Sequence, residues 1–270
     1  MDENFLEGKG VLITGAASGF GRGVANAFSK YGADLALIDI NEEMLEQTSK
    51  NLKQETNKKV LPVVCDVSDS RQVKKMTEQV FSELDNVFIL FNNAGTALSY
   101  GVEILKLGEK AWDMTMNTNL KGEWLVDKFV CRRMNRQNFT PLRGKVIHTT
   151  SIAGMVVDPI LPVYSISKIG IIALNQLIAK ALAPHITSNA IAPGFHVTGI
   201  YGNNEQIMRQ SMEDGNVKTP LNRIGTIQDV IDIMMFLASS RSNFITGHTF
   251  TIDGGIAEVG VSPNTLKSII

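Results

Sequence analysis

Short continuous runs of hydrophobic residues alternate along the chain with longer segments in which hydrophobic residues recur at helical spacing. Such runs are typical of strands buried on both faces, and the longer segments are typical of helices that cover a sheet. This alternation predicts an α/β fold with a doubly wound parallel sheet of about seven strands and helices on both faces. The predicted strands lie at residues 11–14, 35–39, 60–64, 87–91, 145–149, 187–192 and 249–252, and the predicted helices at 21–31, 42–54, 68–84, 109–136, 162–183 and 227–238.

Domain organisation follows from the continuity of this pattern. No linker rich in proline, glycine or serine interrupts it, so residues 1–270 are predicted to form a single domain. Residues 195–221 are long enough to form a lid with a short helix over a substrate site, and residues 256–270 form a C-terminal tail. The most apolar long segment, residues 169–183, is interrupted by polar residues and is predicted to be a core helix, not a membrane span.

Composition excludes several classes of function. The formal net charge of −1 over 270 residues gives no electrostatic reason to expect nucleic acid or an anionic membrane as a partner. Cys65 and Cys131 are the two cysteines, and their spacing fits neither a zinc site nor a disulfide framework. The acidic N-terminus lacks the features of a signal peptide. A cytoplasmic enzyme that uses no metal is the expectation.

A glycine-rich turn, Thr14–Gly21 (TGAASGFG), joins the first predicted strand to the first helix. Glycine lets the backbone turn sharply and approach a ligand closely, and a helix N-terminus attracts a pyrophosphate. In this strand–turn–helix context the turn predicts a dinucleotide site, although glycines chosen for tight packing alone would give the same pattern. The candidate binding residues are Gly15, Ser18, Gly19, Phe20 and Gly21.

Asp39 ends the second predicted strand. A carboxylate at this place can accept hydrogen bonds from both hydroxyls of the adenosine ribose and would repel the 2′-phosphate of NADP. Arg22 is the only basic residue close to the glycine turn. The sequence therefore favours NAD over NADP, and the plainer alternative is that Asp39 caps the next helix.

Tyr164 and Lys168 lie four residues apart in a predicted helix and therefore share one of its faces. A fixed ammonium lowers the pKa of a neighbouring phenol, which makes the tyrosine a usable acid or base near neutral pH. Alone the pair is weak evidence, because a tyrosine and a lysine at this spacing are more often a solvated helix edge.

In combination, these features resemble the short-chain dehydrogenase/reductase family, and the resemblance extends from about residue 8 to residue 255. It implies a Rossmann-like fold. The matching motifs occur in the family's order: Thr14–Gly21, Cys65-Asp66-Val67, Asn92–Gly95 (NNAG), Asn119–Gly122 (NLKG), Ser151–Gly154 (SIAG), Tyr164-xxx-Lys168, Asn189–Gly194 (NAIAPG) and Asp253–Gly255 (DGG).

The resemblance also implies a role for each matching residue. Tyr164 would be the general acid/base, Lys168 would bind the nicotinamide ribose and tune Tyr164, Ser151 would polarise the substrate oxygen, and Asn119 would hold a water. Asp66 and the Val67 backbone would hold the adenine, Asn92 would steady the sheet, and Asn93 would line the cofactor cleft. The carboxamide and a nearby phosphate would be wrapped by Pro193, Gly194, His196 and Thr198.

Plainer interpretations accompany several of these residues. Asp66 and the Asn92-Asn93 pair could be turn formers, and Asn119 could be a kink inside a helix. Ser151 could be one more hydroxyl in a run of three. His148 falls within a buried strand pattern and is predicted to be a hydrogen-bonded core residue without a catalytic role.

The expected function is NAD-dependent hydride transfer between a secondary alcohol and a ketone. Residues 96–107, 155–163 and 195–221 would meet the substrate, and their mixed, partly apolar character suits a hydroxysteroid, an alicyclic alcohol or a polyol. The alternatives are a 3-oxoacyl-thioester reductase, which usually needs NADPH and an acidic carrier protein, a nucleotide-sugar epimerase or dehydratase, and a non-catalytic dinucleotide-sensing protein. The resemblance further implies a homotetramer with helices near 109–136 and 162–184 at one interface.

Overall fold

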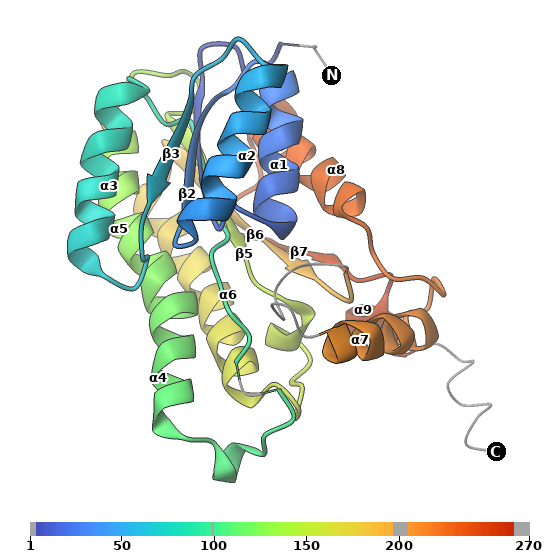
Figure 1. Cartoon of the computed structure of the whole chain (residues 1–270). Coiled ribbons are helices and arrows are strands. Elements are labelled where there is room, and N and C mark those ends of the chain that lie inside the picture. The colour runs from blue at the N-terminus through green and yellow to red at the C-terminus, as the bar shows by residue number, and fades with distance from the viewer. Residues whose placement is uncertain (1–3, 99, 197–204, 262–270) are drawn as a thin grey trace, which may run out of the picture.

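The computed structural model of the chain describes residues 4–98, 100–196 and 205–261. In this part of the chain, seven strands form one parallel sheet in the order β3-β2-β1-β4-β5-β6-β7 (Figure 1). The predicted parallel sheet is confirmed, with strand ends that move by two residues or fewer. The strands are β1 (Gly10–Thr14), β2 (Asp34–Asp39), β3 (Val60–Val64), β4 (Ile89–Asn92), β5 (Gly144–Thr149), β6 (Ile186–Pro193) and β7 (Thr249–Ile252).

Helices cover both faces of the sheet, as the alternating pattern predicts (Figure 1). In the described residues α1, α2 and α8 pack on one face and α3, α5 and α6 on the other. The helices are α1 (Gly19–Lys30), α2 (Glu42–Glu55), α3 (Ser70–Glu83), α4 (Glu109–Met116), α5 (Gly122–Met134), α6 (Pro162–Leu182), α7 (Glu205–Lys218), α8 (Ile227–Ala238) and α9 (Ile256–Val259).

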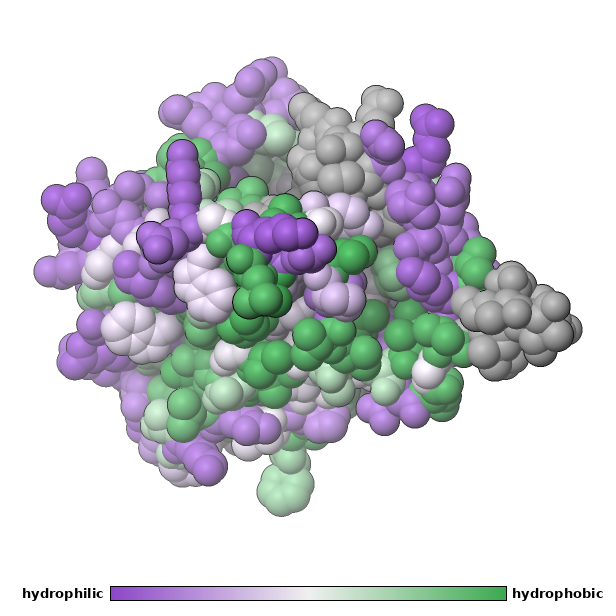
Figure 2. Space-filling model, turned by 90° about the horizontal axis from the view of Figure 1, so that it is seen from below, coloured by the Kyte–Doolittle hydropathy of each residue, from purple (hydrophilic) through white to green (hydrophobic). Residues whose placement is uncertain are grey.

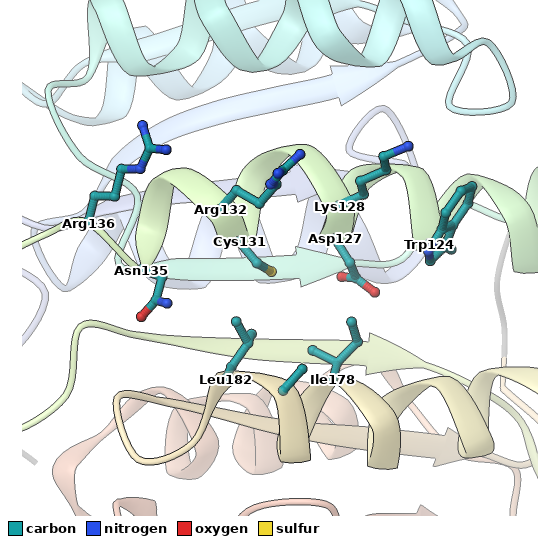
Figure 3. A pocket seen from close by; sticks show the side chains of 10 residues that line it. Trp124, Asp127, Lys128, Cys131, Arg132, Asn135, Arg136, Ile178 and Leu182 are labelled. Atoms are coloured by element: carbon teal, nitrogen blue, oxygen red, sulfur yellow. The ribbon is translucent and has the colours of Figure 1, made fainter.

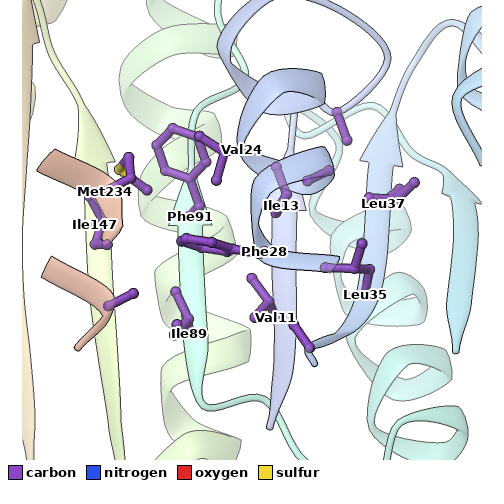
Figure 4. Close-up of a cluster of buried hydrophobic side chains, with 14 of the residues drawn as sticks. Val11, Ile13, Val24, Phe28, Leu35, Leu37, Ile89, Phe91, Ile147 and Met234 are labelled. Carbon is purple, nitrogen blue, oxygen red and sulfur yellow. The ribbon is translucent and has the colours of Figure 1, made fainter. Parts of the chain in front are cut away.

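The two cores follow from the pleat of the strands. In β1, Val11 and Ile13 pack under α1 while Leu12 faces α3 and α5, because successive side chains of a strand point to opposite faces. Phe28 of α1 fills the first core and has no exposed surface (Figure 4). Burial of such a side chain contributes about 1.5–3 kcal/mol.

One predicted helix is interrupted. Residues 109–136 were expected to form a single helix, but a π-helical segment, η2 (Asn117–Lys121), separates α4 from α5. The hydrophobic spacing does not reveal this insertion, because its five residues include one apolar side chain, Leu120, and its buried residue is the polar Asn119. π-helical turns of this kind occur frequently at functional sites.

The predicted lid and the predicted C-terminal tail each lie partly within the described residues. The short helix expected within 195–221 is α7, while residues 197–204 lie outside the described part. The tail contains α9. The Asp253 carboxylate accepts hydrogen bonds from the backbone amides of Gly255 and Ala257 at the start of this helix. Residues 262–270 lie outside the described part.

Within the described residues, α6 is the one helix whose length and hydropathy would allow a membrane crossing. It is nevertheless built into the core of the fold. Ser167, Lys168 and Asn175 are buried on it, and Asn175 accepts a hydrogen bond from Ser188 of β6. These polar contacts with the sheet support its prediction as a core helix.

Candidate active site

The candidate residues gather at the carboxyl ends of the central strands. The glycine turn follows β1, the Asn92-Asn93 pair ends β4, Ser151 follows β5, and Pro193 ends β6. β1 lies between β2 and β4, so the chain leaves it toward one side of the sheet and later returns on the other. In open parallel sheets, ligands bind in the crevice at this switch point.

The glycine turn has the backbone that only glycine adopts easily. Gly15 and Gly19 have φ values of +67° and +52°. A Cβ on Gly21 would lie 2.1 Å from the Gly15 carbonyl oxygen, so this glycine allows α1 to start against the turn. Ser18 is the N-cap of α1, and the first amides of any α-helix have no partner within it.

Asp39 lies beside this turn. Its Oδ2 accepts a hydrogen bond from the Ala17 amide at 2.9 Å, and its Oδ1 accepts one from Asn41 at 3.0 Å. The N-cap of α2 is Asn41, which accepts from Met44, so the interpretation of Asp39 as a helix cap is wrong. The half-buried carboxylate has lone pairs beyond those that these two amides use, and Arg22 is exposed.

These residues fit a dinucleotide. Positive φ angles at the turn, the start of a twelve-residue helix and a carboxylate held at the end of β2 are the features that bind a pyrophosphate and a ribose. Asp66 uses Oδ1 to accept from the amide and hydroxyl of Ser68, as its turn-forming interpretation predicts. Val67 packs against Gly122, where a Cβ would lie 2.9 Å from the valine.

The asparagine pair fastens the crevice. Asn92 is buried and donates to the Glu123 carbonyl oxygen at 2.9 Å, which ties β4 to α5 as its sheet-steadying role predicts. Asn93 donates to the carbonyl oxygens of Thr14 and Gly15 and accepts from Thr149. The side chain of Asn93 is therefore engaged with the protein.

Tyr164 and Lys168 lie one turn apart on α6. The Lys168 Nζ is 5.6 Å from the centroid of the Tyr164 ring and donates to the Thr149 carbonyl oxygen at 2.7 Å. Both residues are buried, which excludes the solvated-edge interpretation of the pair. Burial lowers the pKa of Lys168, and the Glu123 carboxylate opposes this shift.

Ser151 follows β5 at the start of a 3₁₀ turn, η3 (Ile152–Gly154). Its Oγ accepts from the Ala153 amide at 3.2 Å and lies 3.5 Å from the Pro193 carbonyl oxygen, to which it donates. The hydroxyls of Thr149 and Thr150 donate elsewhere, to Asn93 and to the Lys168 carbonyl oxygen. Each of the three hydroxyls therefore has different hydrogen-bond partners, and the Ser151 hydroxyl joins the end of β5 to the end of β6.

Asn119 lies in η2 and is fully buried. Its Nδ2 donates to the Thr96 carbonyl oxygen at 2.9 Å and to Ser167 Oγ at 3.0 Å, and its Oδ1 accepts from the Thr96 amide. Asn119 therefore lies in a π-helical interruption of the predicted helix, and its side chain joins three segments around the site. The water expected at Asn119 stays a prediction.

The segment after β6 closes the other side. Pro193 ends the strand, and a Cβ on Gly194 would lie 2.7 Å from the Asp253 side chain. The His196 ring packs edge-on against Phe20 at 5.3 Å, and burial lowers its pKa. The His196 ring is therefore neutral near physiological pH, and it packs against Phe20. Thr198 lies outside the described residues.

Apolar groups surround the exit from this crevice. Tyr164 forms a small cluster with Ala153 and Leu161, against which Ala97 and Tyr100 pack. The Gly101 amide donates to the Ile160 carbonyl oxygen, which ties the loop after β4 to the loop after β5. Figure 2 shows hydrophobic side chains gathered in the middle of the face seen from below. Leu105, Val157 and Ile160 of the loops after β4 and β5 are exposed.

Sequence reasoning missed a buried acidic cluster behind Lys168. Glu123 and Asp127 are both buried on α5, and both contact His148 of β5. The prediction of His148 as a hydrogen-bonded core residue is confirmed. The available signal was that the two acids share the helical spacing of Val126 and Val130, which are core positions.

The described residues contain no group of three or more histidine, cysteine or acidic side chains that could hold a metal ion.

A separate groove lies on another part of the surface. A groove of about 560 Å³ runs between α5 and α6, with Trp124, Lys128 and Arg132 on one side and Ile178 and Leu182 on the other (Figure 3).

Comparisons with known proteins agree with this arrangement. A family model described as Enoyl-(Acyl carrier protein) reductase matches residues 15–257. The 3-oxoacyl-[acyl-carrier-protein] reductase FabG of Thermotoga maritima is 34% identical over 252 residues, which cover 93% of this chain and 98% of that protein. The solved structure of levodione reductase has a TM-score of 0.86 at 29% identity and covers 93% of this chain and 98% of its own. That of NAD⁺-bound xylitol dehydrogenase has a TM-score of 0.83 at 28% identity and covers 93% and 99%.

Proposed function

Because the chain belongs to the short-chain dehydrogenase/reductase family and is an oxidoreductase by that membership, we propose that it interconverts a secondary alcohol and a ketone with NAD(H) as cofactor. The observation that carries the proposal is the buried Tyr164–Lys168 pair on α6, with Ser151 presented at the end of the adjacent strand. A dinucleotide-sensing protein would not need this triplet, so its presence favours catalysis.

The choice of NAD rests on Asp39. The Ala17 and Asn41 amides hold its carboxylate beside the glycine turn, where a ribose 2′-hydroxyl can donate to it and a 2′-phosphate would be repelled. The NAD⁺-bound xylitol dehydrogenase shows that a protein of similar fold binds this cofactor. Arg22, the nearby cation, is exposed on α1.

The protein's part in the reaction is to orient the substrate and move one proton. A bound nicotinamide supplies the hydride acceptor or donor. In the oxidation direction, the Tyr164 phenolate accepts the hydroxyl proton as the hydride leaves the carbon. In reduction, the Tyr164 phenol donates that proton to the carbonyl oxygen.

Ser151 and Lys168 support the proton transfer. The Ser151 hydroxyl donates to the substrate oxygen in place of its long 3.5 Å contact with Pro193, and thereby fixes that oxygen next to Tyr164. The Lys168 ammonium, held by the Thr149 carbonyl oxygen, stabilises the phenolate. Asn119 fixes the loop after β4 against α6 and keeps this geometry rigid.

The substrate we propose is a small molecule with an apolar carbon frame, such as an alicyclic alcohol or a hydroxysteroid. The apolar cluster around Tyr164 and the exposed hydrophobic residues of the neighbouring loops support this class over a polyol. α7 lies next to the chain that leaves β6, because its Gly215 packs against Phe195.

A second candidate is reduction of a 3-oxoacyl thioester. The name of the Thermotoga maritima relative favours it, and an acyl chain would also suit an apolar entrance. Asp39 argues against it where NADPH is the reductant.

The test is a kinetic comparison at 340 nm. Purified protein is assayed with NADH and NADPH against cyclic ketones, 3-oxosteroids, keto sugars and acetoacetyl-coenzyme A, and with NAD⁺ against the matching alcohols. We expect a higher kcat/KM with NADH and turnover of a cyclic ketone. Preference for NADPH with the thioester would instead establish the second candidate.

A further inference from the structure

A row of four buried ionisable side chains runs inward from the candidate active site. Lys168, Glu123, His148 and Asp127 are between 0% and 2% exposed and come from α6, α5 and β5. The Lys168 Nζ lies 4.0 Å from Glu123 Oε1, and Glu123 Oε2 lies 2.9 Å from His148 Nδ1. His148 Nε2 in turn lies 3.8 Å from Asp127 Oδ2.

Hydrogen bonds alone do not explain this row. Glu123 Oε1, His148 Nε2 and Asp127 Oδ2 are buried without a hydrogen-bond partner. An unpartnered polar atom in a protein interior destabilises the fold, and an unpartnered charged group does so more strongly. The burial of a carboxylate beside an ammonium is therefore explained only if the two charges stabilise one another.

The proton positions are set by the neighbours. Burial lowers the pKa of His148, so its ring is neutral near physiological pH, and the tautomer that carries its proton on Nδ1 donates to the Glu123 carboxylate across 2.9 Å. Asn92 donates to Asp127 Oδ1, and burial raises the pKa of Asp127 to about 7. The carboxyl group of Asp127 points from α5 toward α6 (Figure 3), at the end of the row away from Lys168.

Glu123 and Lys168 depend on one another for charge. Burial raises the pKa of Glu123, and the Lys168 ammonium opposes that rise. Burial lowers the pKa of Lys168, and the Glu123 carboxylate opposes that fall. Each charge therefore stabilises the other, and donation from the Nδ1–H tautomer of His148 favours the charged form of the carboxylate.

We propose that Glu123 is a positioning residue of the active site, whose carboxylate is the internal counter-ion that keeps Lys168 positively charged in a pocket closed to water. The proposal rests on the proposed roles of Tyr164 and Lys168. Among the described residues, the ionisable groups that face Lys168 are Glu123 of α5, His148 of β5 and Tyr164 of α6, and Glu123 is the one of these that carries an opposing charge next to Nζ.

The consequence for Tyr164 has a definite sign. Without the Glu123 charge, burial alone acts on Lys168, which then loses its proton at a lower pH. The phenol of Tyr164 consequently ionises next to a neutral amine, and its pKa rises toward or above the ordinary value of about 10.

The experiment is a titration of Tyr164 that needs no substrate and no cofactor. Tyrosinate absorbs at 295 nm, and the chain has four tyrosines, so the difference between each protein and its Tyr164→Phe counterpart isolates this residue. Glu123→Gln removes the charge at nearly constant shape, and Glu123→Met removes it without burying an unpaired amide. We expect both to move the Tyr164 midpoint upward by about one pH unit or more.

Two matched variants separate charge from shape and from net charge. Glu123→Asp keeps the carboxylate and is expected to recover at least half of the shift. Glu55→Gln, at the exposed end of α2, is expected to leave the midpoint unchanged. A midpoint that stays in place or falls in both charge-removing variants would overturn the proposal, as would an Asp variant without any recovery.

The same titration separates this proposal from the proposed function. If the protein oxidises no alcohol and reduces no ketone but the midpoint still moves upward, the counter-ion stands and the proposed reaction fails. If turnover is found but the midpoint is insensitive to Glu123, the reaction stands and the counter-ion role fails.

Discussion

At the scale of single residues, the site consists of side chains whose chemistry is set by what holds them. Asp39 is an example: two backbone amides fix its carboxylate at the edge of the glycine turn, leaving its remaining lone pairs for a ligand. Lys168 is another, because its ammonium is held by the Thr149 carbonyl oxygen in a buried position. In both cases the residue type was evident from the sequence, and the support came from residues distant in the chain.

Replacement of Asp39 tests the basis of cofactor choice. In Asp39→Ala, a ribose hydroxyl loses a charged acceptor, which is worth about 1.5–3 kcal/mol or roughly 10- to 100-fold in the KM for NADH. The KM for NADPH should fall or stay unchanged, because the repulsion of a 2′-phosphate is removed. Steady-state kinetics with both cofactors measure the ratio.

Asp39→Asn is the matched variant, since it keeps the shape and loses the charge. It should shift the ratio of the KM for NADH to the KM for NADPH in the same direction as Asp39→Ala. A ratio unaffected by either change would mean that the carboxylate serves only to hold the turn through Ala17.

At the scale of elements, the strands and most helices were predictable because their hydrophobic periods differ. The strand at residues 60–64 and the helix at residues 227–238 have the predicted ends. The π-helical segment around Asn119 was not predictable, because it depends on hydrogen bonds to Thr96 and Ser167, which are distant in sequence. The motif residues were found by resemblance, whereas Glu123 and Asp127 were missed since buried acids are rare and have no local signature.

The glycine turn yields a prediction about an element junction. A Cβ on Gly21 would lie 2.1 Å from the Gly15 carbonyl oxygen, so Gly21→Ala must push α1 away from the turn. Overpacking of this kind costs about 1–3 kcal/mol, which lowers the Tm by roughly 2–12 °C. NADH affinity should fall as well, and calorimetry with fluorescence titration measures both.

Gly108→Ala is the control for this change. Gly108 precedes α4 at a negative φ, and a Cβ there would meet nothing within 4 Å. Its Tm and NADH affinity should match those of the unmodified protein. If Gly21→Ala behaved in the same way, the close packing of α1 on the turn would not matter for binding.

At the scale of the whole molecule, one surface has the character of an interface. α6 exposes Ile166, Ile169 and Leu177, and the groove between α5 and α6 adds Trp124 and Ile178 (Figure 3). We propose that this surface joins copies of the chain in a homotetramer, as the family resemblance implies. Exposed apolar side chains on one helix, together with an apolar-lined groove beside it, support an association site.

Light scattering after gel filtration tests the assembly. The unmodified protein should elute as an oligomer, and Leu177→Glu, which puts a charge on the exposed face of α6, should elute as a smaller species. Leu105→Glu, which puts the same charge on an exposed apolar residue of the loop after β4, should leave the mass unchanged. A monomer at micromolar concentration without any substitution would contradict the assembly.

The central claim concerns the whole site, and Tyr164→Phe tests it most directly. This variant removes only the hydroxyl that exchanges the proton and leaves the cofactor crevice intact. The Kd for NADH, measured by fluorescence, should change by less than about twofold, while kcat for the best alcohol or ketone should fall by roughly 10²- to 10⁴-fold. Substantial turnover by Tyr164→Phe with that substrate would contradict the assignment of Tyr164 as the proton-transferring group.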